Sequence, residues 1–522
     1  MDKFTRNFRK TYGSAIFSGM LVALSFPRTD YYPLAWVALV PLLYSLYFLD
    51  KKNAFRFGFT FGIVYFFGTC YWIYYSINHY GSVPLFPSLL LVLVLCCYLS
   101  LYPAVFAMLF AVHMKKTDMP VMFVAPILWT SLEFLRSYAL TGFPWSSLGY
   151  SQYSFLPAIQ IADITGIYGV SFLIVAFNGV LADILLMKHR REERPLYSLL
   201  PTVTGFVLMA LAVVFTFSYG FYRLHQDRDG PTVRVAVLQG NIEQDHKWDP
   251  AYQQSVISAY KELSIAAATQ KPDLIVWPET ALPFVFGKNE ALTEDLKFFQ
   301  AGLHSYLLTG TITEKEEDGL SGRAKNKRGP LKYSNSAVLL NAVGKVSYIY
   351  DKIHLVPFGE YVPLRKILFF VDKLAYGIGD YNPGTSYMRA VTPFGSFGTL
   401  ICYEVIFPGL ARKFFSKDGD FLITITNDAW FGKTCGPYQH FSMAVFRAVE
   451  NRKPVIRAAN SGISGFIDSR GRVLVKTDLF KRTFSVMDIK KDKTVTVYTK
   501  YGDIFSFLCI ISSLLFLIKK YD

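Results

Sequence analysis

Cysteine and charged residues are both scarce in this chain of 522 residues. Its six cysteines include no Cys-x-x-Cys pair and no cysteine–histidine cluster, which excludes a disulfide framework and gives no sign of a metal site. Only 18% of the residues are charged and 52% are hydrophobic, which excludes a disordered chain. Because the charged residues concentrate between about 223 and 503, we expect a membrane protein that carries one soluble domain.

Long uncharged blocks mark the candidate membrane spans, since roughly 20 apolar residues cross a bilayer core. These blocks are residues 11–27, 31–49, 57–113 with a break at 78–84, 119–132, 164–182, 195–222 and 504–518. We predict seven transmembrane helices in an N-terminal domain, 1–222, and one more in the segment 501–522, which ends in a short tail. A signal peptide is the alternative for the first block, but only Phe26-Pro27-Arg28 follows it, without a small-residue cleavage site.

Lysine and arginine fall in alternate loops between these blocks. They precede the first helix and follow the second, fourth, sixth and last helices. With an even number of helices, this bias places both termini in the cytoplasm and the soluble domain, 223–500, on the opposite side. The net charge of +15 is therefore interpreted as topology and not as a nucleic-acid-binding surface.

A polar run at the end of the fifth predicted helix is not explained by apolar periodicity. Glu133 and Arg136 lie on one helical face, where a carboxylate and a guanidinium can neutralise each other in lipid. Two interpretations stay open: a structural ion pair at the helix end, or a surface that helps to hold a polar head group.

The segment 223–500 alternates apolar strands with amphipathic helices, which is typical of an α/β domain. Strands are predicted at 232–238, 273–277, 306–312, 398–402, 421–426, 455–459 and 465–468, a hairpin at 336–350, and helices at 250–269 and 440–451. We find no internal repeat.

Three strand ends carry residues with reactive side chains. Glu279 follows the strand 273–277, Lys352 follows the hairpin, and Cys402 ends the strand 398–402. A thiolate that attacks an acyl carbonyl needs a base to take its proton and fixed positive charge for the oxyanion. Glu279 in an apolar site is suited to be the base, and Lys352 with the backbone N–H after the cysteine to stabilise the oxyanion. The sequence therefore predicts acyl transfer without a metal or cofactor, although each residue alone is more often structural.

The order Glu279, Lys352, Cys402 resembles the nitrilase superfamily, whose fold is an α-β-β-α sandwich. Over nearly its whole length the sequence is similar to the apolipoprotein N-acyltransferase family of bacterial inner membranes. The motifs that carry this resemblance are Gln239-Gly240-Asn241-Ile242, Lys247-Trp248-Asp249-Pro250, Trp277-Pro278-Glu279-Thr280, residues 354–363, Cys402-Tyr403-Glu404, and residues 426–432 and 457–462.

The resemblance implies a ping-pong reaction. A membrane phospholipid donates an acyl chain to Cys402 as a thioester, and the N-terminal amine of a diacylglyceryl-cysteine lipoprotein accepts it. Glu279 is then the base, Lys352 the oxyanion stabiliser and Cys402 the nucleophile. The resemblance also implies a multi-pass protein of the inner membrane with its catalytic domain in the periplasm.

The same resemblance nominates further substrate-binding or supporting residues, which are Trp248, Glu360, Tyr403 and Glu404. For Glu360 and Glu404 the alternative is a buried carboxylate that only holds a loop, and for Trp248 it is a core residue. The two histidines at 354 and 440 are interpreted as packing residues.

Cys435 departs from the family pattern, and a free thiol without a role is the favoured interpretation, since a disulfide with Cys402 would inactivate the enzyme. Residues 364–377 are predicted to form a lid at the membrane surface, with a buried helix as the alternative. Two other functions stay open: a membrane-tethered amidase that hydrolyses small amides, and a noncatalytic membrane protein with a decayed domain.

Overall fold

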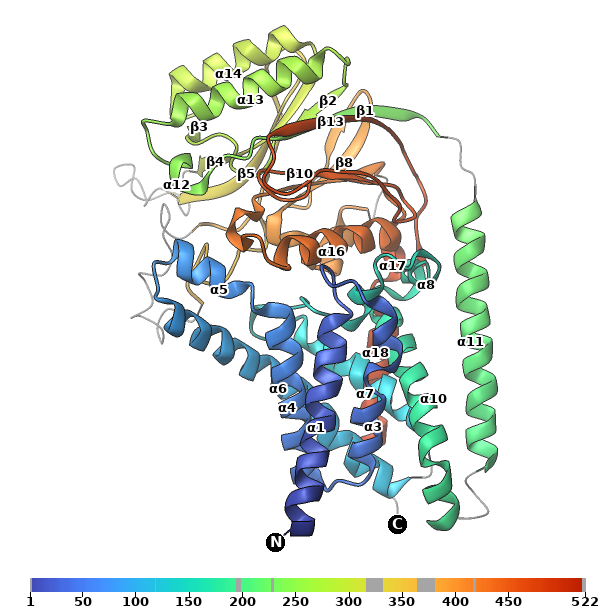
Figure 1. The fold of residues 1–522 in the computed structure, drawn as a ribbon. Helices are drawn as coiled ribbons and strands as arrows, with labels where there is room; N and C mark the ends of the chain where they lie inside the picture. Colours follow the sequence, from blue (N-terminus) through green and yellow to red (C-terminus); the bar gives the residue numbers. More distant parts are fainter. Residues whose placement is uncertain are drawn as a thin grey trace, which may run out of the picture. The chain divides into compact units, whose positions relative to one another are not determined.

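The computed structural model describes residues 2–117, 119–193, 199–226, 230–315, 332–363, 381–415 and 419–518 (Figure 1). The chain divides into two compact units. The helical unit comprises residues 1–74, 83–227 and 496–522, and the α/β unit comprises residues 75–82 and 228–495. The predicted lid, 364–377, lies outside the described residues and stays a prediction.

Within the described residues, each uncharged block of the sequence contains at least one helix. The main helices of the helical unit are α1 (Asp2–Leu24), α3 (Val40–Tyr47), α4 (Lys51–Cys70), α6 (Leu85–Lys116), α7 (Val121–Arg136), α10 (Ile167–Glu193), α11 (Leu199–His225) and α18 (Ile504–Ile518). A helix satisfies its backbone polar groups internally, which an apolar segment in lipid requires. Small residues allow these helices to pack closely: a side chain at Gly62 of α4 would bring its Cβ within 2.8 Å of Ser100 Cα on α6.

Helix length limits how many of these segments can be counted as membrane spans. Among the described residues, three helices are long and apolar enough to cross a membrane: Leu85–Lys116, Ile167–Arg190 and Val203–His225. A fourth is added if Lys51–Cys70 and Ile73–Tyr80, bent by 60°, form one span, and three further apolar helices are shorter. Apolar helices are thus present as expected of a membrane protein, but the predicted count of seven plus one is not confirmed.

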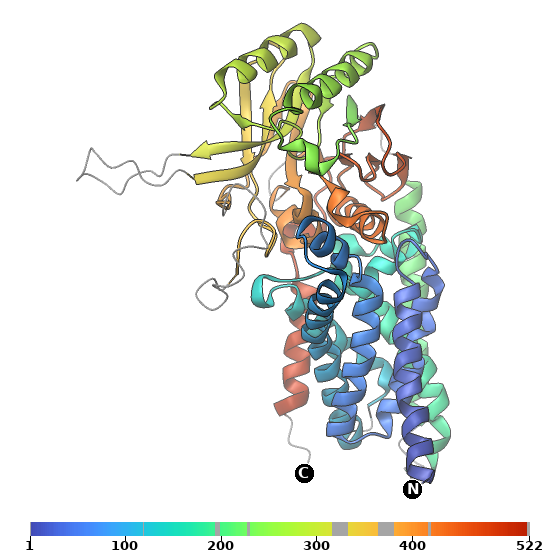
Figure 2. The same cartoon turned by 60° about the vertical axis from the view of Figure 1, so that its left-hand side comes forward.

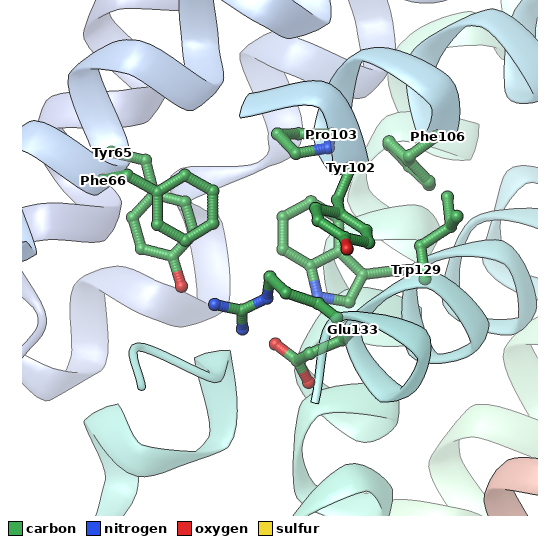
Figure 3. Close-up of a pocket in the computed structure, with 9 residues that line it drawn as sticks. Tyr65, Phe66, Tyr102, Pro103, Phe106, Trp129 and Glu133 are labelled. Carbon is green, nitrogen blue, oxygen red and sulfur yellow. The ribbon is translucent and has the colours of Figure 1, made fainter. Parts of the chain in front are cut away.

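Glu133 and Arg136 lie in the last turns of α7 and contact the segment that follows it. Glu133 Oε1 accepts a hydrogen bond of 2.7 Å from the backbone N–H of Leu148, and Arg136 donates one of 2.6 Å to the carbonyl of Trp145. The Arg136 guanidinium also lies 5.1 Å from the centre of the Phe66 ring. Figure 3 shows the Glu133 carboxylate at the edge of a pocket lined by aromatic rings. Both charged side chains therefore hold the segment that follows their helix.

Two sheets form the centre of the α/β unit. Within the described residues, the larger sheet has the order β13-β1-β2-β4-β5-β6, with β3 paired to β4, and the smaller has the order β12-β11-β10-β9-β8-β7. The larger sheet contains β1 (Thr232–Gln239), β2 (Leu274–Val276), β3 (Val285–Phe286), β4 (Tyr306–Lys315), β5 (Lys332–Leu340), β6 (Val346–Asp351) and β13 (Thr483–Lys490). The smaller sheet contains β7 (Ala390–Thr392), β8 (Gly395–Ile401), β9 (Phe421–Thr426), β10 (Val455–Ala459), β11 (Gly465–Ile467) and β12 (Val473–Lys476).

Helices cover the outer face of each sheet. α13 (Gln253–Ala268) and α14 (Glu290–Leu303) lie side by side over the larger sheet, and α16 (Gly436–Asn451) lies over the smaller one (Figures 1 and 2). Both sheets are mixed: β1, β2 and β4 run parallel, whereas β4, β5 and β6 run antiparallel. The predicted α/β sandwich is confirmed.

The core between the helices and the larger sheet is aromatic at its centre. Trp277 is fully buried, its ring stacks on that of Tyr260 at 5.1 Å between centres, and its indole N–H donates to Ser264 at 2.9 Å. A buried indole needs such a partner. This packing fixes the end of β2, directly before the residues considered next.

Candidate active site

Glu279 leaves the sheet after β2 and turns into the interior. Its side chain is only 8% exposed. One carboxylate oxygen accepts a hydrogen bond of 2.8 Å from the Asn335 amide, and the other accepts one of 3.0 Å from the backbone N–H of Asn427. These donors come from both sheets, so the position of the carboxylate depends on the whole sandwich.

Lys352 follows β6 and lies between two carboxylates. Its Nζ donates to Glu360 Oε1 at 2.9 Å and lies 3.6 Å from Glu279 Oε1. Burial disfavours the charge on Lys352, but the carboxylates of Glu360 and Glu279 outweigh burial and raise the pKa of the amine. Lys352 is therefore an ammonium ion at neutral pH, although its side chain is only 1% exposed.

Cys402 lies one residue beyond β8, at the start of the 3-10 turn η6 (Cys402–Ile406). Its φ of +51° is in the left-handed region, so the thiol-bearing residue sits at a sharp turn directly after the strand that it was predicted to end. Burial raises the pKa of the thiol, and the Glu279 carboxylate adds to the rise, whereas Lys352 and a hydrogen bond with Thr426 oppose it. The thiol is therefore protonated at neutral pH and needs a base.

Glu360 completes the arrangement around Lys352. Its Oε1 accepts from the Asn335 amide at 2.9 Å as well as from Lys352, and its Oε2 accepts from the backbone N–H of Val356 at 2.8 Å. Asn335 thus bridges the carboxylates of Glu279 and Glu360. We did not predict Asn335 from the sequence, because it stands between Ser334 and Ser336 in the polar half of β5, where an amide is no distinctive signal.

Glu404 connects the Lys352 segment to the Cys402 turn. One carboxylate oxygen accepts hydrogen bonds from Tyr350, Ile353 and His354, and the other accepts one of 2.7 Å from the backbone N–H of Ile401. Burial raises the pKa of Glu404 to about 7, while the bonds from Ile401 and His354 oppose this rise. The contacts of Glu404 are therefore those of a buried carboxylate that holds two segments of the chain together.

Tyr403 and Trp248 keep part of their surface exposed. The Tyr403 ring is half-buried and lies against the rings of His354 and Phe407, 5.9 and 5.3 Å away between centres. Trp248 follows the short helix α12 (Gln244–Lys247) and is 37% exposed. The core interpretation of Trp248 is therefore wrong.

Lys247 belongs to the site but was not predicted to. It is fully buried, and its Nζ donates to the backbone carbonyl of Glu279 at 3.0 Å. Burial lowers the pKa of Lys247 to about 8, while the negative charge of Glu279 opposes the shift. The signal in the sequence is a lysine directly before a motif tryptophan, which alone does not indicate burial.

The remaining motifs meet through asparagine side chains. Asn460, after β10, accepts from the backbone N–H of Ile242 at 3.0 Å and donates to its carbonyl at 2.7 Å. Its amide also donates to the Asn427 side chain, which in turn donates to Gln244. The motifs at 239–242, 426–432 and 457–462 are thus neighbours in the structure.

None of the six cysteines, all of which lie among the described residues, forms a disulfide bond, and Cys435 is buried. Within the described residues, no group of three or more His, Cys, Asp or Glu side chains could hold a metal ion.

Comparison with known proteins identifies the family. Residues 18–180 match the apolipoprotein N-acyltransferase N-terminal domain, and residues 234–498 match the carbon-nitrogen hydrolase domain. The apolipoprotein N-acyltransferase of Geobacter metallireducens is 43% identical to this chain over 98% of its length and 95% of the relative's. The chain belongs to the apolipoprotein N-acyltransferase family.

Other members of the apolipoprotein N-acyltransferase family are also similar over nearly the full length. The protein of Pasteurella multocida is 34% identical over 94% of this chain and 92% of that protein. Among solved structures, Nit3 of Saccharomyces cerevisiae, from the nitrilase superfamily, is 18% identical with a TM-score of 0.38, covering 50% of this chain and 90% of that one. The protein is an acyltransferase of the nitrilase superfamily, and the predicted resemblance is confirmed.

Proposed function

We propose that the protein transfers an acyl chain from a membrane phospholipid, through a thioester on Cys402, to the N-terminal amine of a diacylglyceryl-cysteine lipoprotein. The observation that carries this proposal is the buried Lys352 ammonium, held between Glu279 and Glu360 and acting on the Cys402 thiol. The names of the relatives supply the lipoprotein acceptor. The phospholipid donor rests on the resemblance and on the apolar helices of the same chain.

In the first half-reaction, Glu279 takes the proton of the Cys402 thiol, and the thiolate attacks the carbonyl carbon of a phospholipid acyl ester. The Lys352 ammonium and the backbone N–H of Tyr403 stabilise the tetrahedral oxyanion. When the C–O bond breaks, the departing oxygen takes the proton from Glu279. A lysophospholipid leaves, and the acyl chain stays on sulfur as a thioester.

In the second half-reaction, the amine of the lipoprotein attacks the thioester carbon. Glu279 accepts one proton from the attacking nitrogen as the C–N bond forms. The C–S bond then breaks, and the sulfur takes this proton from Glu279, so that the products are an amide and the free thiol. Glu279 serves both half-reactions, because it takes up one proton and returns it in each and so ends each half-reaction as a carboxylate.

The other predicted residues have supporting roles in this proposal. Glu360 orients Lys352, and Glu404 fixes the distance between the segments that carry Lys352 and Cys402. Trp248 and Tyr403, which keep exposed surface, are proposed to contact the substrates.

We further propose that this is an inner-membrane protein with its catalytic domain in the periplasm. The proposed domains are 1–222 for the membrane helices, 223–500 for catalysis and 501–522 for the C-terminal span and tail. The alternate basic loops support this orientation.

Transfer to a synthetic diacylglyceryl-cysteine peptide tests the proposal. Purified protein with phosphatidylethanolamine in detergent is expected to convert the peptide into an N-acyl amide, detected by its mass. Cys402→Ala is expected to abolish the product, whereas the matched variant Cys435→Ala retains it. Release of free fatty acid without the amide product would contradict the proposal and favour the amidase alternative.

A further inference from the structure

His440 makes a contact that its interpretation as a packing residue did not include. It lies on α16 and is fully buried. Its Nε2 is 3.1 Å from the backbone carbonyl oxygen of Cys402. Since a carbonyl oxygen can only accept a hydrogen bond, Nε2 carries a proton and donates it to the residue that holds the nucleophile.

The other ring nitrogen faces an ion pair that keeps this proton in place. Nδ1 lies 2.9 Å from Asp428 Oδ1 and 2.9 Å from an Arg457 guanidinium nitrogen, which itself lies 2.8 Å from Asp428 Oδ2. A neutral ring can accept at Nδ1 from Arg457, and a protonated ring can donate there to Asp428. In both states the proton on Nε2 still points at the Cys402 carbonyl.

The carbonyl of Cys402 belongs to the same peptide unit as the N–H of Tyr403. A peptide unit is planar and trans, so its C=O and N–H point in opposite directions. Fixing the carbonyl therefore fixes the direction of the Tyr403 N–H, the backbone donor assigned to the oxyanion. The unit follows a residue with φ of +51°, which a side-chain-bearing residue adopts only when its surroundings hold it there.

We propose that His440 is a positioning residue: its Nε2–H holds the Cys402–Tyr403 peptide plane so that the Tyr403 N–H faces the developing oxyanion. This inference rests on the proposed acyl transfer and deepens it. The donated hydrogen bond also polarises the peptide unit, which strengthens the Tyr403 N–H as a donor. Asp428 and Arg457 act on the reaction only through His440.

A pair of amide variants separates positioning from packing. In His440→Gln the side-chain nitrogen can take the place of Nε2, whereas the shorter His440→Asn places its nitrogen near Nδ1, too far from the carbonyl. Both replacements are polar and differ by one methylene group. The full-length protein in detergent is mixed with phosphatidylethanolamine, and single-turnover acylation of Cys402 is followed by mass over a range of lipid concentrations.

We expect the maximal acylation rate of His440→Asn to fall by about 10- to 100-fold. This loss is smaller than the loss expected when a direct oxyanion donor is removed. The lipid concentration for half-maximal rate should stay within about twofold, and His440→Gln should recover most of the rate. Stoichiometric alkylation of Cys402 by iodoacetamide checks that each variant is folded around the site.

Two results would overturn the inference while leaving the proposed function intact. One is a wild-type acylation rate in His440→Asn. The other is an equal loss of acylation rate in His440→Gln and His440→Asn when Cys402 is fully alkylated in both variants. If the wild-type protein itself formed no acyl adduct, the failure would lie with the proposed function.

Discussion

At the scale of single residues, the reactivity of Cys402 depends on two opposite charges. Burial raises the pKa of the thiol, Glu279 raises it further, and Lys352 lowers it. Replacing Glu279 by Gln should therefore move the pH midpoint of thiol alkylation to a lower value, and replacing Lys352 by Met should move it to a higher one. The rate of reaction with a small neutral alkylating reagent, measured across pH, checks both directions.

The same variants separate ionisation of the thiol from catalysis. Glu279→Gln should lose acylation by phospholipid even though its thiol ionises more easily, because an amide cannot carry the proton between sulfur and the leaving oxygen. A midpoint that rises in Glu279→Gln and falls in Lys352→Met, or normal thioester formation in Glu279→Gln, would remove Glu279 from the role of base.

Residue types at strand ends could be predicted from the sequence, but their partners could not. Glu279, Lys352 and Cys402 follow apolar strands, and that pattern was enough to nominate them. Glu404, in contrast, binds the backbone of Ile353, and Lys247 binds the carbonyl of Glu279. These partners are distant in the chain, and only the paired sheets bring them together.

At the scale of elements, a π-helical turn supports the loop beside the nucleophile. Within the α/β unit, Ser76 and Tyr80 of η2 (Ser76–Tyr80) donate to the carbonyls of Trp430 and Ala429 in η7 (Asp428–Phe431). The Tyr80 and Trp430 rings also lie 4.6 Å apart between centres. η7 begins directly after Asn427, whose N–H donates to Glu279. The contact between η2 and η7 therefore helps to position the proposed base.

A substitution at Gly432 tests whether the contact between η2 and η7 supports the site. The φ of Gly432 is +57°, and an added Cβ would lie 2.8 Å from the Tyr75 ring. Gly432→Ala should therefore destabilise the protein by about 2–4 kcal/mol, through backbone strain plus overpacking, and should slow acylation. Gly287 is the matched control: its φ is +86°, but nothing lies within 4 Å of an added Cβ, so Gly287→Ala should cost only about 1–2 kcal/mol.

Thermal unfolding of both glycine variants in detergent measures the difference, and acylation of Cys402 measures its effect on the site. If Gly432→Ala matched Gly287→Ala in stability and rate, the contact between η2 and the η7 loop would have no role in positioning Glu279.

Buried strands were predicted correctly from the sequence, whereas an edge strand and one helix were missed. β9 and β10 lie at 421–426 and 455–459, as predicted, because their residues are all buried and mostly apolar. β13 was missed because its side chains are mostly half-exposed, and it pairs with β1 from the far end of the domain. α14 was missed although its signal was present, with Asn289 capping it and Leu292, Leu296 and Leu303 at helical spacing.

At the scale of the whole molecule, the proposed reaction requires a periplasmic catalytic domain. In cells whose protein lacks Cys435, a cysteine in place of exposed Lys345 should react with a membrane-impermeant maleimide from outside. A cysteine in place of exposed Lys52, at the start of α4, should react only after lysis. The reverse pattern would overturn the proposed orientation and with it access to a periplasmic lipoprotein.

The central claim is that an acyl chain passes through the sulfur of Cys402, and the mass of the Cys402 peptide tests it most directly. Protein incubated with phospholipid and no acceptor should yield this peptide with one acyl chain in place of the thiol hydrogen. Neutral hydroxylamine or the diacylated peptide should remove the adduct. A peptide that stays unmodified while the same preparation acylates the acceptor would contradict the account, because the chain would then pass directly from lipid to amine.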